Sequence, residues 1–199
     1  MTARAGMSNL ILTLRGMCNA GTADVTIGTV AYWNDNHLQD VLDLHRLDIY
    51  GEPLAIIETY SGGGTIEYKT YQSQYQNFEE TTGGTAIFYL EESDGYDIGT
   101  ALYTVDYQRG MITFAADTSG TAYYLTGRSF DMNAAAADVW RRKAAQVAGS
   151  FSFSTDNHRV DKGSLIKNAM SMADFYSRLA MPVTSVVYRG DVNDLALKR

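Results

Sequence analysis

The sequence predicts an α+β protein: a four-helix bundle with an antiparallel β insert between its second and third helices, followed by an extended C-terminal arm. Apolar residues repeat at helical spacing in four segments, two on each side of the middle of the chain. The middle consists of β-branched and aromatic runs separated by turn residues, and the last residues show no amphipathic period. We therefore expect a discontinuous helical bundle of residues 1–50 and 131–182, a β-rich insert of residues 51–130 and an arm of residues 183–199.

The first two helices are predicted from apolar stripes and capping residues. The first stripe spans residues 7–18 and ends in a Thr/Gly-rich stretch. The second helix begins at Asn34 or Asp35, both good N-caps, and is expected to stop near residues 50–51. His45 falls on its apolar side, which favours a packed, hydrogen-bonded histidine in the core over a metal ligand or a catalytic base.

Short strands fill the middle of the chain. Their β-branched and aromatic residues, with polar and apolar positions alternating, suit a pleated sheet with one wet face. We predict strands at Leu54–Tyr60, Thr65–Tyr71, Ala86–Leu90, Ala101–Asp106, Met111–Phe114 and Thr121–Thr126. Together they form a small antiparallel sheet or a barrel, and the sequence does not separate these two arrangements.

Helical spacing returns after the strands. Asp131 is a suitable cap for a helix that reaches residue 148, and a fourth helix covers residues 165–180 before Pro182. Because two helices bury their stripes poorly alone, we expect all four to pack into one bundle. The exposed side of the third helix carries a basic triplet, which is either a solvated face or a contact with a neighbouring subunit. The triplet is Arg141, Arg142 and Lys143.

Charge and composition exclude several classes of protein. The 199 residues carry a net charge of −7, and residues 51–130 hold eleven acids and three bases, or −8. A protein that grips nucleic acid by its phosphates needs the opposite balance. A single cysteine, Cys18, predicts no disulfide framework, and neither a secretory signal nor a membrane-spanning run is recognisable.

Motifs for catalysis or cofactor binding are weak in this sequence, so we expect no enzyme, no cofactor and no metal site. The three histidines are far apart and belong to no spaced ligand set. Glu58 and Glu67 on adjoining strands are the best pair for a hydrolase, but their spacing is not diagnostic. The tyrosine-rich insert offers another alternative, a module that stacks saccharides on aromatic rings.

The last seventeen residues contain many apolar side chains that a lone ordered monomer would leave in water. Docked on a partner, these side chains would bury area that stabilises the complex by about 25 cal/mol per Å². Residues 184–188 have high β propensity, so strand addition to another chain is a suitable mode. A frayed tail is the alternative.

The order of these parts resembles the head-to-tail adaptor (connector or head-completion) proteins of long-tailed bacteriophages. Three stretches in the helical parts, about half of the chain, carry the resemblance. The first is Trp33-Asn34-Asp35 with Leu38-Gln39 and Leu42-Asp43; the second is Phe130-Asp131 with Ala134–Ala137, Val139 and Trp140; the third is Gly149–Ser154 with Leu165, Ala173, Tyr176 and Ala180. The β insert departs from the smallest family members, in which the link between these helices is short.

The resemblance implies a non-enzymatic part of the virion neck, made in the host cytoplasm. Such proteins form a homo-oligomeric, dodecameric ring that joins the portal protein to the next neck or tail-completion protein. DNA passes through the channel without specific binding during ejection, and no membrane is involved. The resemblance places the portal contact in the arm, with Val186, Val187, Tyr188, Arg189, Val192, Leu195 and Leu197 as candidates, and it makes Arg141, Arg142 and Lys143 candidates for subunit contacts.

Overall fold

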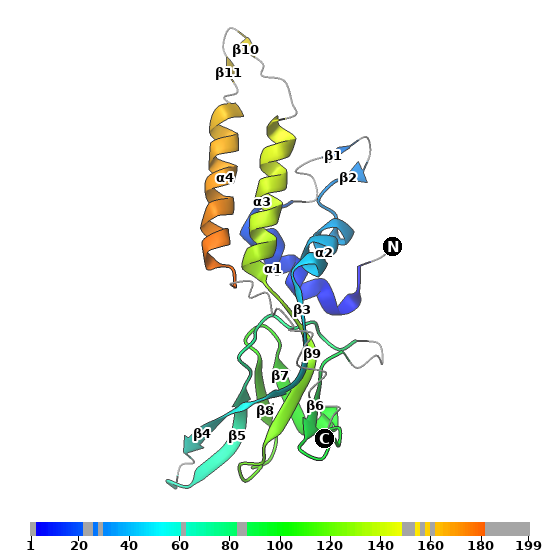
Figure 1. Ribbon diagram of the computed structural model, residues 1–199, viewed down its shortest axis with the longest axis vertical. Helices are drawn as coiled ribbons and strands as arrows, with labels where there is room; N and C mark the ends of the chain where they lie inside the picture. Colours follow the sequence, from blue (N-terminus) through cyan, green and yellow to red (C-terminus); the bar gives the residue numbers. More distant parts are fainter. Residues whose placement is uncertain are drawn as a thin grey trace, which may run out of the picture.

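Two hydrophobic cores organise this chain, one among its helices and one between two antiparallel sheets. The computed structural model describes residues 3–21, 26–27, 30–60, 63–82, 87–148, 154–155, 158–159 and 162–181. The helices lie at one end of the molecule and the larger sheets at the other (Figure 1). The fold is therefore mixed α+β.

Four α-helices and a 3₁₀ turn form the helical end. They are η1 (Ala5–Met7), α1 (Ser8–Cys18), α2 (Asp35–Leu44), α3 (Met132–Ala148) and α4 (Lys162–Leu179). The predicted caps are confirmed: the Asn34 side chain accepts a hydrogen bond from His37 N at 3.1 Å, and Asp131 Oδ1 accepts from Asn133 N and Ala134 N at 3.0 Å each. Both interactions satisfy amide groups that a helix start leaves without partners.

The prediction of a four-helix bundle is wrong. The buried cluster at the helical end is built by α1, α2 and α3, with Trp33 and Phe130 beside them, whereas α4 contributes only the half-buried Tyr176. The buried positions on α4 are Ala169 and Ala173, and α4 packs against α3. Because α3 and α4 have 17 and 18 residues and α1 and α2 have 11 and 10, the longer pair extends beyond the shorter one (Figure 1).

The strands form two larger sheets and two small ribbons. One sheet has the order β3-β9-β6, from β3 (Arg46–Pro53), β9 (Tyr123–Phe130) and β6 (Tyr89–Glu92). The other has the order β4-β5-β8-β7, from β4 (Ala55–Tyr60), β5 (Ile66–Gln72), β8 (Met111–Phe114) and β7 (Tyr103–Asp106). The ribbons pair β1 (Thr26–Ile27) with β2 (Val30–Ala31) and β10 (Ser154–Thr155) with β11 (His158–Arg159), and η2 (Thr100–Leu102) precedes β7. The insert is thus two antiparallel sheets.

The core between the sheets is largely aromatic. Tyr71, Phe114 and Tyr123 meet with ring centroids 4.6–5.4 Å apart, and Phe78 packs edge-on against Phe88 at 5.2 Å. Such offset and edge contacts add to the stabilisation that burial of the rings provides. Several tyrosines of the insert therefore serve the hydrophobic core, with Tyr71 fully buried.

The second helix ends earlier than its sequence predicts. It stops at Leu44, and β3 begins at Arg46 and pairs with β9 from Arg46↔Phe130 onward. His45 is consequently the C-cap of α2 rather than a residue of the helix interior, and its Nε2 lies 3.6 Å from Asp138 Oδ2, beyond hydrogen-bond distance. The expectation of a hydrogen-bonded core histidine is wrong for this ring atom.

Candidate functional site

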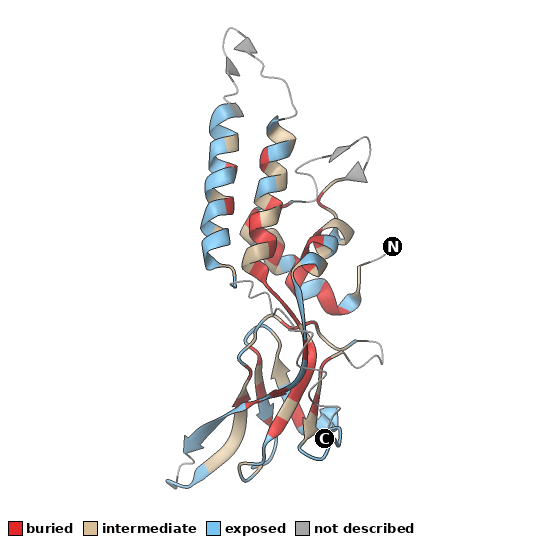
Figure 2. Ribbon diagram, in the orientation of Figure 1, coloured by how far each residue is buried: buried red, intermediate tan, exposed pale blue. Residues whose placement is uncertain are grey.

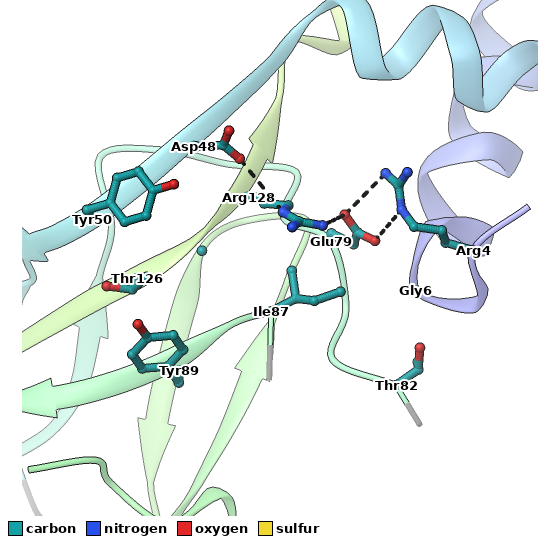
Figure 3. Close-up of a pocket in the computed structure, with 11 residues that line it drawn as sticks. Arg4, Gly6, Asp48, Tyr50, Glu79, Thr82, Ile87, Tyr89, Thr126 and Arg128 are labelled. Carbon is teal, nitrogen blue, oxygen red and sulfur yellow. Dashed lines mark hydrogen bonds and ion pairs between the residues drawn. The ribbon is translucent and has the colours of Figure 1, made fainter. Parts of the chain in front are cut away.

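An open pocket of about 460 Å³ lies where the helical end meets the β3-β9-β6 sheet (Figure 3). Arg4 and Gly6 border it from the segment before α1, and Tyr50, Tyr89 and Thr126 border it from the three strands. The two tyrosines lie on the side of the pocket away from Arg4. The pocket is thus charged on one side and aromatic on the other.

A network of charged side chains forms the first side of this pocket. Arg4 makes a two-pronged contact with Asp43, at 2.6 and 2.9 Å, and its Nε donates to Glu79 Oε1 at 2.8 Å. Arg128 lies 3.7 Å from both Glu79 and Asp48. The Glu79 side chain is 0% exposed, so its charge depends on these two arginines.

This network holds the start of the chain against the sheet. Hydrogen bonding to Asp43 raises the pKa of the Arg4 guanidinium above its already high ordinary value, so the cation stays charged. Gly6 is needed for the close approach, because a Cβ there would lie 2.2 Å from the carbonyl oxygen of Glu80. Since each arginine is engaged by carboxylates, the pocket suits a neutral polar ligand better than an anion.

The carboxylates considered for acid–base chemistry lie elsewhere. Glu67 is in β5 and forms an ion pair of 2.9 Å with Lys69, while Glu58 is exposed in β4. Neither residue lines the pocket of Figure 3. Among the described residues, no three His, Cys, Asp or Glu side chains are grouped so that they could hold a metal ion.

The basic triplet of α3 makes contacts within the subunit. Arg141 donates to Ser177 Oγ of α4 at 3.2 Å, and Arg142 lies 3.5 Å from Asp138 on its own helix. Lys143 donates to the carbonyl oxygen of Asn19, the residue that follows α1, at 2.9 Å. Arg141 and Lys143 thus tie α3 to α4 and to the end of α1, while Arg142 pairs within α3.

The arm, with its seven candidate portal contacts from Val186 to Leu197, lies outside the described residues. The position from which it continues is well defined. Asp131 Oδ2 accepts a hydrogen bond from Met181 N at 2.7 Å, and Asn133 Nδ2 donates to the carbonyl oxygen of Leu179 at 3.2 Å. The end of α4 is therefore fastened to the start of α3, next to the junction with the sheet.

The side of α4 beside its α3 contact carries large apolar residues with seven-residue spacing. This α4 stripe consists of Leu165, Met172, Phe175 and Leu179, and the first, third and fourth are 49%, 54% and 53% exposed. Figure 2 shows buried positions on α4 only toward α3. An apolar face of this extent in water is typical of an interaction site.

Sequence reasoning missed the Arg4–Glu79 network. Its members come from the N-terminal segment, α2, β3, the segment between β5 and β6, and β9. They are separated by up to 124 positions in the sequence, from Arg4 to Arg128. No local pattern marks any of them. The Asp131 contact with Met181 was missed for the same reason, although the capping role of Asp131 was predicted.

Comparisons with protein-family models, with curated proteins and with solved structures found no match to this chain. Among the described residues, none of the helices is long and apolar enough to cross a membrane.

Proposed function

We propose that this protein is a structural subunit of the neck of a long-tailed bacteriophage. In this role it forms a ring with copies of itself, joins the portal to the next neck or tail protein and continues the channel through which DNA leaves the head. The role is one of assembly and not of catalysis. The observation that carries the proposal is the α4 stripe, whose side chains stay half in water unless another chain covers them.

The fastening of α4 supports a docking role for the arm. Asp131 and Asn133 hold residues 179–181 by two hydrogen bonds, so the arm begins from a fixed point on the subunit. A fixed starting point reduces the conformational freedom that the arm loses when it binds, which favours affinity. The arm is then well suited to bind the portal by strand addition, with Val186, Val187 and Tyr188 in its β-prone segment.

The charge of the insert opposes DNA binding and suits a ring through which DNA passes, whether the insert lines the channel or faces outward. Residues 51–130 carry a net charge of −8, and an acidic surface repels phosphates. An insert that lines the channel would let DNA pass without holding it. This agrees with a conduit and opposes a DNA-binding role.

Binding to the portal protein encoded by the same phage tests the proposal. We expect the full-length chain to co-migrate with portal rings in size-exclusion chromatography, and a chain ending at Met181 to lose that binding. Val187→Asp should weaken it strongly, whereas Asn193→Asp, which adds the same charge at a polar position, should not. If the full-length chain fails to bind portal rings, the neck role is wrong; if the shortened chain binds as tightly, only the role of the arm is wrong.

The pocket of Figure 3 favours a second candidate, a module that binds host-surface saccharides. Tyr50 is 79% exposed, and it borders the pocket together with Tyr89 and the hydroxyl of Thr126. An exposed ring beside hydrogen-bonding groups is what sugar stacking requires. Glycans titrated into the full chain by calorimetry should then bind, and Tyr50→Ala should abolish binding while Tyr96→Ala, at another exposed tyrosine, leaves it intact. Absence of heat with all glycans would remove this candidate.

A further inference from the structure

The helical end has a hollow on the side of α3 opposite to α4. This α1–α2 hollow measures about 620 Å³, and its apolar part is formed by Ala3, Ile11 and Leu12. The rest of its lining is polar or charged: Arg4, Ser8, Asn9, Arg15, Asn34, Asp35 and Asn36. Leu12 is 68% exposed at its border. An apolar side chain from another molecule could replace water against Ala3, Ile11 and Leu12.

The outer side of α2 that continues from the hollow is acidic. α2 contains Asp35, Asp40 and Asp43 and no Lys or Arg. Arg15 pairs with Asp35 at 2.6 Å and Arg4 pairs with Asp43, while Asp40 is exposed. Because Asp35 and Asp43 are paired in this way, Asp40 is the acid of α2 that this side presents to a partner.

The side of α4 carries the opposite charge. α4 has three basic residues and one acidic residue, and Lys167 and Arg178 are both exposed. These cations share the helix with the apolar α4 stripe. The α4 stripe can thus replace water against Ala3, Ile11 and Leu12 in the hollow, and the exposed cations of α4 are opposite in charge to Asp40 on α2.

The two surfaces lie on opposite sides of the helical end. Both α2 and α4 contact α3, and Figure 1 shows them on its two sides. One molecule cannot bring its own α4 stripe into its own α1–α2 hollow. Two copies can, and because the two surfaces differ, each added copy leaves one of each free for the next.

We propose that copies of this chain associate head to tail, with the α4 stripe of one copy docked in the α1–α2 hollow of the next. The inference rests on the self-association in the proposed function and assigns its two surfaces. Such a contact closes into a ring when the rotation between copies divides a full turn evenly, and otherwise it grows into a filament. It also places the interface away from the basic triplet of α3, whose side chains are engaged within the subunit.

Cysteine cross-linking of the full chain tests this arrangement. Cys18 is 0% exposed, so new cysteines report on their own positions. We expect Phe175→Cys mixed with Leu12→Cys to give a disulfide-linked pair under oxidation, each variant alone to give none, and a chain with both substitutions to give a ladder of multimers. Tyr96→Cys, exposed on a turn of the insert, is the matched control and should not cross-link to Phe175→Cys.

The outcomes separate this inference from the neck role. A linked pair from Phe175→Cys alone would show that α4 pairs with α4, and it would overturn the head-to-tail arrangement. No cross-link above the Tyr96→Cys control, both in free protein at high concentration and in protein mixed with portal rings, would overturn the surface assignment even if portal binding is intact. Conversely, a ladder without portal binding would support the inference and contradict the neck role.

Sedimentation gives an independent reading of the same contact. Phe175→Glu should raise the dissociation constant for self-association by about tenfold or more, because a charge would enter an apolar contact without a partner. Raising the salt concentration should weaken association of the unchanged chain, since opposite charges contribute to it. Self-association that neither change affects would contradict the proposed interface.

Discussion

Arg4→Ala is expected to destabilise the protein far more than the loss of an ordinary surface ion pair. Arg4 is the closest cation to Glu79, at 2.8 Å, and the Glu79 side chain is 0% exposed. After the substitution Arg128, at 3.7 Å, is the one cation left near that carboxylate among the described residues. The variant therefore leaves a buried charge with one distant partner.

The magnitude follows from the burial of the two carboxylates. Removing one partner of a buried ion pair costs about 3–5 kcal/mol, and the remaining attraction of Arg128 favours the lower part of this range. Asp43 is 28% exposed, so losing its contact with Arg4 adds less than about 1 kcal/mol. We expect the free energy of unfolding to fall by about 3–4 kcal/mol in total.

Urea unfolding near neutral pH, followed by circular dichroism, measures this loss. Arg46→Ala is the matched control, because Arg46 pairs with Asp48 at 3.0 Å and both side chains are 35% exposed. We expect the control to lose at most about 1 kcal/mol. An Arg4→Ala variant no less stable than the control would refute the reasoning that Glu79 depends on Arg4.

Three further predictions concern the cores and a turn. Burial raises the pKa of Tyr103 to about 12, so the neutral phenol favours the folded state at a pH below about 10, and this preference is lost as the pH rises through 12. When the free energy of unfolding is measured at increasing alkaline pH, Tyr103→Phe should lose less stability than the unchanged chain. That variant should also gain about 1 kcal/mol at neutral pH, since the buried hydroxyl has no hydrogen-bond partner among the described residues, and thermal unfolding tests this. Burial raises the pKa of the Cys18 thiol to about 12, so a thiol reagent should modify it only after unfolding, and rapid labelling of the native chain would contradict its burial. Gly110→Ala should destabilise by more than about 1 kcal/mol, because φ is +67° and the new Cβ would lie 2.2 Å from Tyr75 O, whereas Gly16→Ala in α1 should stabilise by about 0.5–1 kcal/mol in the same urea assay.

Features with a local cause could be predicted from the sequence. Asn34 and Asp131 are helix caps because their side chains reach amides two or three residues away, and such a contact is written in adjacent positions. The strand Met111–Phe114 was predicted with its observed bounds for a similar reason, since turn residues flank it on both sides. The predicted helix ends and strand ends elsewhere shift by a few residues.

Features that depend on distant partners could not be predicted. Residues 45–50 continue the apolar pattern of α2, so the sequence predicts that the helix extends over them. In the structure residues 46–49 pair with residues 127–130 of β9 and form part of a strand. The prediction of a four-helix bundle was wrong because it placed the apolar residues of α4 against α1 and α2. In the structure Leu165, Phe175 and Leu179 face solvent. Their spacing was recognised, but which molecule would cover them was not.

The junction between helices and sheet has a mechanical consequence. α2 passes into β3 through His45 alone, and β9 passes into α3 through Asp131 alone. These two residues are themselves joined, because Asp131 N donates to His45 O at 3.0 Å and so adds one more rung to the β3–β9 ladder. Because each connection is one residue long and the two residues are hydrogen-bonded to each other, we expect a force applied to the sheets to tilt α2 and α3 together rather than to bend the molecule at a hinge.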